Sequence, residues 1–346
     1  MTINVAVVTS EAVILGCDSV ASVTQNFLNP VPFVQQDNAG NFEVDENGKY
    51  VARFTYEDLQ SVVTDAWGGV TKMFQLCGDE NPVAAVTAGL AKLNDRPISA
   101  LANDFSKQIA APGSNDSVIG VVEKFVEFIS GHYETHHQAI GGPPQFREDV
   151  EFLIGGFGKN DNFPSLYRVN LIDKADKRIK PLYGSGAGFE DKTGAAWAGY
   201  ADGVQRLLFG FDIPLRGKVE DQVSKAINSF HKSMSDTMLR ILAETLAALK
   251  SSNLPAGVNT ELPPKPDVKI KWDQFILSID FANLPLQSAL DFVAYLVGLQ
   301  SGKSKYVRGV PTVGGRTHIG ILTKGKFEMK NEPDLIHTNL GYDRGI

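Results

Sequence analysis

Residues 1–19 read MTINVAVVTSEAVILGCDS, two short apolar runs joined by a polar turn. Both runs are rich in valine and isoleucine, the β-branched residues that favour strands. Thr9-Ser10-Glu11 supplies the turn between them. The stretch therefore predicts a β-hairpin, with Asp18 placing an acid at the end of its second strand.

Thr2 follows the initiator methionine, and a small residue at this position normally leads to removal of Met1. Removal leaves Thr2 with a free α-amine. Such an amine can act as the general base for the hydroxyl of the same residue, which is the threonine variant of nucleophile-plus-base catalysis. The alternative is that Met1 stays and that Thr2 is an ordinary strand residue.

Six further segments follow the hairpin in a fixed order: 70–76 (VTKMFQL), 83–91 (VAAVTAGLA), 151–157 (EFLIGGF), 165–169 (SLYRV), 183–188 (YGSGAG) and 311–321 (PTVGGRTHIGI). Together with Thr2 and the hairpin they resemble the proteasome β-type, HslV-like N-terminal-nucleophile hydrolases, here a bacterial proteasome-like protein with insertions. Each segment alone is unspecific. Their order over most of the chain carries the resemblance.

The resemblance implies an α+β fold, a four-layer αββα sandwich of the N-terminal-nucleophile hydrolase type. It implies a threonine peptidase that self-assembles into a ring or related homo-oligomer. Its substrate would be a peptide or unfolded protein, delivered with an ATPase or another activator. The family needs no cofactor and no metal for this chemistry.

The resemblance also assigns roles to single residues. Thr2 would be the nucleophile, Lys72 the nearby positive charge, and Asp18 the acid that pairs with Lys72. Gly89 would bind the oxyanion through its backbone N–H, and Ser185 would support the Thr2 amine. Independently, Lys72 lies in an apolar strand segment, which predicts a buried ammonium in need of an acidic partner.

Ala21, Thr87 and Ala91 match the family's substrate-binding pocket. Because all three are small, we expect an apolar side chain to be accepted before the scissile bond.

The sequence departs from the family pattern just before its Gly-Gly strand. The active family has an aspartate and, three residues later, a serine, whereas this chain has Val310 and Val313, with Thr312 the only hydroxyl nearby. The polar network around the amine is therefore incomplete. This favours a first alternative, a catalytically silent scaffold or assembly subunit. A second alternative is an amidase of the same superfamily that acts on a small amide.

Composition narrows the classes of partner. The chain has 346 residues and a net charge of −7, without a Lys/Arg cluster, which gives no support for nucleic acid or an anionic membrane as a partner. Two cysteines, Cys17 and Cys77, in apolar contexts favour reduced core thiols over a disulfide. No apolar run approaches the roughly 20 residues of a membrane span, and the sequence shows no signal-peptide pattern. We expect a cytoplasmic protein.

Helical periodicity is expected over 91–110, 117–131, 192–209, 218–250 and 286–300. We expect one proteasome-like domain over 1–346, with insertions at about 22–62 (a β-hairpin subdomain), 111–150, and 210–275 (a long helix and a Pro-rich loop). The loop reads as an exposed connection or, alternatively, as a docking segment.

Within 218–250, apolar residues recur every three to four positions. This stripe predicts packing on the chain's own core in preference to a subunit contact.

His132, His136 and His137 lie close to one another in a helical segment. Their spacing does not match a zinc-peptidase helix, and histidines are favoured near helix C-termini. A metal site is therefore the less favoured interpretation.

Overall fold

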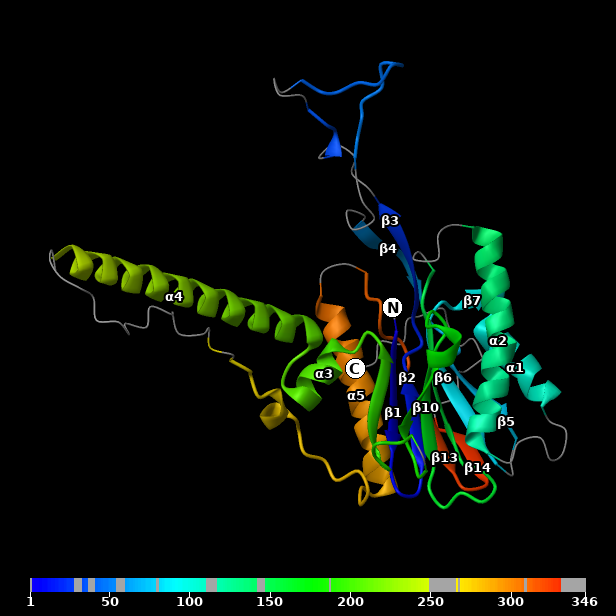
Figure 1. Ribbon diagram of the computed structural model, residues 1–346. Coiled ribbons are helices and arrows are strands. Elements are labelled where there is room, and N and C mark those ends of the chain that lie inside the picture. Colours follow the sequence, from blue (N-terminus) through cyan, green and yellow to red (C-terminus); the bar gives the residue numbers. More distant parts are fainter. Residues whose placement is uncertain are drawn as a thin grey trace. The chain divides into compact units, whose positions relative to one another are not determined.

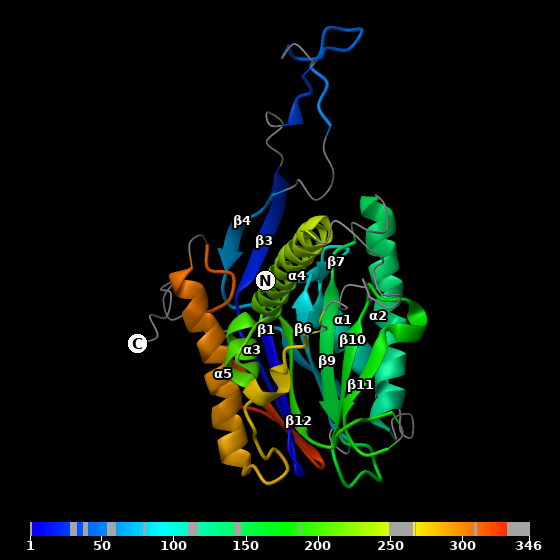
Figure 2. The same ribbon diagram turned by 60° about the vertical axis from the view of Figure 1, so that its left-hand side comes forward.

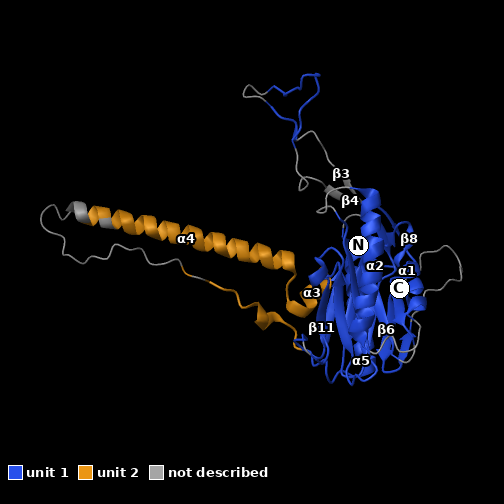
Figure 3. Cartoon of the chain, turned by 45° about the vertical axis from the view of Figure 1, so that its right-hand side comes forward, with its two compact units in different colours: residues 1–201, 279–346 blue, residues 202–278 orange. Residues whose placement is uncertain are grey.

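The computed structural model describes residues 2–27, 33–36, 41–53, 60–78, 81–109, 117–141, 147–186, 188–248, 266, 268–307 and 310–330. Met1 and residues 253–265 of the Pro-rich loop lie outside these ranges. The chain divides into two compact units. The first comprises residues 1–201 and 279–346, and the second comprises residues 202–278 (Figure 3).

The first unit contains two five-stranded antiparallel sheets (Figure 1). In order across the sheet, sheet I consists of β12 (Gly194–Gly199), β1 (Ile3–Val8), β2 (Val13–Cys17), β13 (His318–Thr323) and β14 (Lys326–Met329). Sheet II consists of β11 (Ile179–Tyr183), β10 (Ser165–Asn170), β9 (Val150–Gly156), β6 (Val83–Gly89) and β5 (Met73–Cys77).

The opening hairpin forms as expected, because β1 and β2 pair antiparallel from Asn4 opposite Cys17 to Val8 opposite Val13. Every residue of both strands is buried. The turn is closed by Thr9, whose N–H donates to the Ala12 carbonyl at 2.9 Å and whose hydroxyl accepts the Ala12 N–H at 3.1 Å. Strands covered on both faces carry few polar residues, which explains the apolar runs.

The two sheets pack face to face, and helices cover their outer faces (Figure 2). Helix α5 (Leu286–Tyr306) packs on β1, β2 and β13 of sheet I. Helices α1 (Ile98–Gln108) and α2 (Val118–Ile140) pack on sheet II. The chain is therefore an α+β protein.

The apolar core lies in separate layers. Between the sheets, side chains from both meet, including Ala6, Leu15, Met73, Val86 and Leu153. Under α1 and α2 the core is aromatic: the Phe125 ring lies 5.2 Å, centroid to centroid, from both Phe105 and Phe152. Ser117 caps α2 by accepting the Gly120 N–H at 3.2 Å.

Two expected helices begin later than predicted. Residues 92–97 form the short strands β7 (Lys92–Leu93) and β8 (Arg96–Pro97) before α1. Residues 194–199 form β12, and only Asp202–Phe209 is helical (α3). The helix prediction for 192–199 is wrong because pairing with β1 overrides the helix propensity of alanine. A 3₁₀ turn, η4 (Ala175–Lys177), precedes β11.

The first expected insertion contains paired strands. β3 (Ala21–Phe27) pairs antiparallel with β4 (Gln60–Trp67). Between them, isolated bridges join Val34 to Ala52 and Val44 to Tyr50. Both bridges span a turn in which the Asp45 side chain accepts the N–H of Lys49. In the second expected insertion, the described residues include α2.

The second unit contains α3, the long helix α4 (Ile213–Ala248) and a 3₁₀ turn, η5 (Trp272–Phe275). Within the apolar stripe, Phe230, Met238 and Ile241 are 67 %, 47 % and 53 % exposed. The expectation that the stripe packs on the chain's own core is therefore wrong for these residues. None of the helices in the described ranges has the length and hydropathy that a bilayer crossing requires.

Candidate active site

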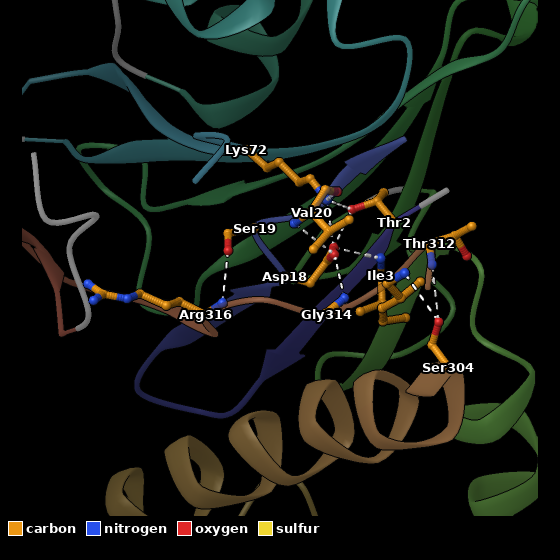
Figure 4. Close-up of polar contacts among 11 residues, drawn as sticks. Thr2, Ile3, Asp18, Ser19, Val20, Lys72, Ser304, Thr312, Gly314 and Arg316 are labelled. Atoms are coloured by element: carbon orange, nitrogen blue, oxygen red, sulfur yellow. Dashed lines mark hydrogen bonds and ion pairs between the residues drawn. The ribbon is translucent and has the colours of Figure 1, made fainter. Parts of the chain in front are cut away.

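Three residues that are distant in the sequence meet at one end of the sheets (Figure 4). Thr2 precedes β1, Asp18 follows β2, and Lys72 precedes β5. The Lys72 ammonium donates to Thr2 Oγ1, and the Thr2 hydroxyl donates to Asp18 Oδ1. Lys72 Nζ and Asp18 Oδ1 lie 2.7 Å apart. The structure thus brings together the expected nucleophile, its cation and the paired acid.

Lys72 uses its full donor capacity inside the protein. An ammonium has three N–H groups, and its acceptors here are Thr2 Oγ1, Asp18 Oδ1 and the Val20 carbonyl. Its side chain is only 7 % exposed. A buried ammonium held by three acceptors is fixed in place, so its charge acts on the Thr2 oxygen at short range.

Asp18 is held by the backbone around it. Its Oδ1 accepts the Ile3 N–H at 3.1 Å, and its Oδ2 accepts the N–H groups of Val20 at 3.2 Å and Gly314 at 3.0 Å. A buried carboxylate is tolerated only when it is paired and hydrogen-bonded. These bonds, together with Lys72, meet that requirement.

Two serines that the sequence analysis missed shape the loop next to the site. Ser19 accepts the Arg316 N–H at 2.8 Å, and its own N–H donates to the Gly314 carbonyl at 3.1 Å. Ser304, on α5, accepts the N–H groups of Thr312 and Val313 at 3.2 and 3.3 Å (Figure 4). They hold the backbone that presents the Gly314 N–H to Asp18.

The two valines that replace the family's polar residues contribute no polar group. Val313 is fully buried, whereas Val310 is exposed. From α5, Ser304 Oγ reaches this loop and accepts two of its backbone N–H groups.

Gly89 occupies a backbone conformation that requires glycine. Its φ is +95°, and a Cβ at this position would lie 1.9 Å from the Asp149 carbonyl oxygen. The residue is exposed at the end of β6. A backbone N–H held in a fixed turn is a group suited to bind an oxyanion.

The expected substrate-pocket residues lie on three segments. Ala21 is buried next to Val20, whose carbonyl accepts from Lys72. The Thr87 N–H donates to the Lys72 carbonyl at 3.0 Å, and its buried hydroxyl has no partner among the described residues. Ala91 is exposed, beyond β6. The structure thus places Ala21 and Thr87 beside residues of the site.

Ser185 is not brought to this site. It follows Tyr183, which pairs with Leu166 and through it with Gly155, at the end of sheet II remote from Thr87. Ser185 is exposed, and no described contact joins it to Thr2, Asp18 or Lys72. The reason is topological, because β10 and β11 reverse direction and carry the Gly-Ser-Gly turn to the far end.

The histidines of α2 have other surroundings. His136 Nδ1 accepts the Asn94 N–H at 3.1 Å, and burial lowers the pKa of His137 below its ordinary value. Among the residues that the structure describes, no three His, Cys, Asp or Glu side chains are grouped to hold a metal.

Cys17, next to Asp18, gives a direct check of the burial at the site. Burial, followed by the charge of Asp18, raises the pKa of its thiol to about 12, against an opposing effect of Lys72. The thiolate is the form that reacts, so we expect iodoacetamide at pH 8 to spare Cys17 in the folded protein and to modify it after denaturation. Peptide mass spectrometry would show this. Alkylation of Cys17 in the folded protein at the rate of a free thiol would contradict the burial of the site.

No family model matches the chain, and no curated protein matches it. Solved structures do. Anbu (ancestral beta-subunit) from Yersinia bercovieri is 11 % identical, with a TM-score of 0.31 over 60 % of this chain and 65 % of that one. Anbu from Hyphomicrobium sp. strain MC1 is also 11 % identical, with a TM-score of 0.31 over 59 % and 64 %.

These matches correct the HslV-like assignment made from the sequence. The matching structures are Anbu proteins, not HslV-type subunits. The chain spans less than two thirds of their length, and the likeness is too low to carry an argument about fold or activity. The site geometry stands on its own.

Proposed function

We propose that this protein is a proteasome-like N-terminal threonine peptidase on a four-layer αββα sandwich. The observation that supports it most is the buried Lys72 ammonium bonded to Thr2 Oγ1 and held by Asp18. A surface threonine needs no such partner. A nucleophilic oxygen does, because a fixed positive charge stabilises the negative charge that develops on it.

The mechanism begins with removal of Met1. The freed Thr2 amine takes the hydroxyl proton, and Oγ1 attacks the carbonyl carbon of a peptide bond. Lys72 stabilises the developing alkoxide, and the Gly89 N–H accommodates the oxyanion of the tetrahedral intermediate. The amine then returns the proton to the leaving group, and water cleaves the ester on Thr2. Asp18 keeps Lys72 in position throughout.

Cleavage can be tested with fluorogenic peptides that carry an apolar side chain before the scissile bond. Ala21 and Thr87 beside the site are small and buried, which favours an apolar side chain at this position. We expect fluorescence release by the native protein and no release after Thr2→Ala. Equal release by both proteins would mean that a contaminant is responsible, and no release by the native protein would remove the proposal.

A silent scaffold is the second candidate. Val310 and Val313 supply no polar group, and Ser185 lies at the far end of sheet II. A subunit of this kind would keep the fold and lose turnover.

The proposed peptidase also implies assembly. Peptidases of this type confine their sites by oligomerisation, and the exposed Phe230, Met238 and Ile241 on α4 offer an apolar surface. We expect a homo-oligomer of about six or more subunits, since head-to-tail contacts that close produce rings. Light scattering at micromolar concentration measures the mass. A monomer would contradict self-compartmentalisation.

A further inference from the structure

The edge strand β12 carries a row of backbone groups that face away from its neighbour β1. Alternate residues of an antiparallel edge strand point both backbone groups outward. The Tyr200 N–H donates inward to the Thr2 carbonyl at 2.7 Å. Counting back along the register, the outward residues are Ala195, Trp197 and Gly199.

Each outward residue is met by a side chain from a different strand of sheet II. The Tyr183 hydroxyl, on β11, donates to the Ala195 carbonyl at 2.9 Å. Arg168 Nη2, on β10, donates to the Trp197 carbonyl at 2.7 Å.

The third side chain comes from β9: burial raises the pKa of the Glu151 carboxyl, and the Gly199 N–H of β12 is among the groups that oppose this rise. Three successive strands thus hold the free edge of sheet I.

At the end of the row near Thr2, two of the side chains also contact each other. Arg168 Nε lies 3.0 Å from Glu151 Oε1, and the Glu151 side chain is only 16 % exposed. The contact is an ion pair, and Arg168 Nε makes no hydrogen bond within the described residues. Gly199, the last residue of the row, packs against Thr2: its φ is +77°, and a Cβ on it would lie 2.3 Å from the Thr2 carbonyl oxygen.

We infer that Glu151, Arg168 and Tyr183 are positioning residues for Thr2. They fix β12, and β12 fixes the Thr2 carbonyl through the Tyr200 N–H. The side chain and amine of Thr2 branch from the same Cα as that carbonyl, so their orientation toward a substrate depends on the row. The catalytic consequence of this inference rests on the proposed peptidase function. Its structural part rests only on the contacts that these side chains make with β12.

The position of each bond along β12 predicts a graded effect. Glu151 acts next to Thr2, Arg168 two residues further away, and Tyr183 at the far end. We expect Glu151→Ala and Arg168→Gln to slow covalent reaction with a peptide epoxyketone by about tenfold. Tyr183→Phe should leave it within about twofold. Arg168→Lys, which keeps one charged donor, should recover part of the rate.

Arg178→Gln is the matched control. Arg178 also pairs with an acid, Glu134 at 3.2 Å, and donates to a backbone carbonyl, that of Asp173 at 3.0 Å. It makes no described contact with β12. The control measures the general cost of losing a partly buried, paired arginine.

Two readouts separate the inference from the proposed function. Hydrogen exchange of the peptide that contains Tyr200 should accelerate in Arg168→Gln and not in Arg178→Gln. Epoxyketone reactivity should follow the same order. If the native protein forms no adduct but exchange responds as stated, the positioning holds and the peptidase proposal fails. If Arg168→Gln and Arg178→Gln match in exchange and in adduct rate, the inference is overturned.

Discussion

Replacing Lys72 with alanine is expected to lower peptide hydrolysis by about 10²–10³, the usual cost of removing one charge partner of the transition state. The ammonium contacts Thr2 Oγ1 directly and is buried. Without it, the alkoxide formed on Thr2 has no counter-charge. Turnover of an apolar fluorogenic peptide, measured at saturating substrate, gives the effect on kcat.

The same substitution leaves Asp18 as a buried charge with fewer partners. Removing one member of a buried ion pair costs about 3–5 kcal/mol of stability, so the variant must be assayed at a temperature at which circular dichroism shows it folded. Rescue by an added alkylammonium ion, which can enter the space left by the lysine stem, would separate a chemical role from a structural one. Lys225→Ala is the control, because Lys225 forms an exposed ion pair with Asp221 on α4. Unchanged turnover in Lys72→Ala would mean that the assigned site is wrong.

The strands around the site were predictable because their patterns are local. β1 and β2 are short, apolar and separated by a polar turn, so pairing partner and register follow from the hairpin itself. Burial of Lys72 could also be predicted, since apolar neighbours in a strand segment favour a core position for a lysine that has an acidic partner. The family resemblance predicted that Asp18 pairs with Lys72. In the structure, Lys72 Nζ lies 2.7 Å from Asp18 Oδ1.

Features that depend on distant pairing could not be predicted in the same way. The alanine-rich stretch 194–199 has helix propensity, and only its pairing with β1 makes it a strand. Ser304 lies within a helix and acts on a loop eight residues later, so no periodicity singles it out. Ser185 was placed from a short motif, and the motif says nothing about the end of the sheet at which its turn lies.

The apolar stripe of α4 shows a third kind of limit. The three-to-four-residue spacing of apolar residues identifies an apolar face of a helix, but it does not identify what covers that face. The exposed Phe230 and Met238 show that the described part of the chain leaves this face open there.

The N-terminus is expected to decide all catalytic activity. Thr2 can be its own base only when its amine is free, because an amide nitrogen has no basic lone pair and a neutral hydroxyl is a weak nucleophile near neutral pH. We expect intact mass to show that Met1 is absent from the purified protein. We also expect a covalent adduct with a peptide epoxyketone, a reagent that needs both Oγ and the α-amine of one residue to close its ring.

Substitutions at Thr2 test the two groups separately. Thr2→Ala keeps the free amine and removes Oγ, so the adduct and peptide hydrolysis should both disappear. Thr2→Ser keeps both groups but loses the methyl that restricts χ1, so it should retain part of the rate. Lys72 and Asp18 remain bonded to each other in both variants, which should therefore stay folded. Retention of Met1 in the native protein together with no adduct would instead support the silent scaffold, in which the buried Lys72–Asp18 pair serves only to hold the end of β1 against sheet II.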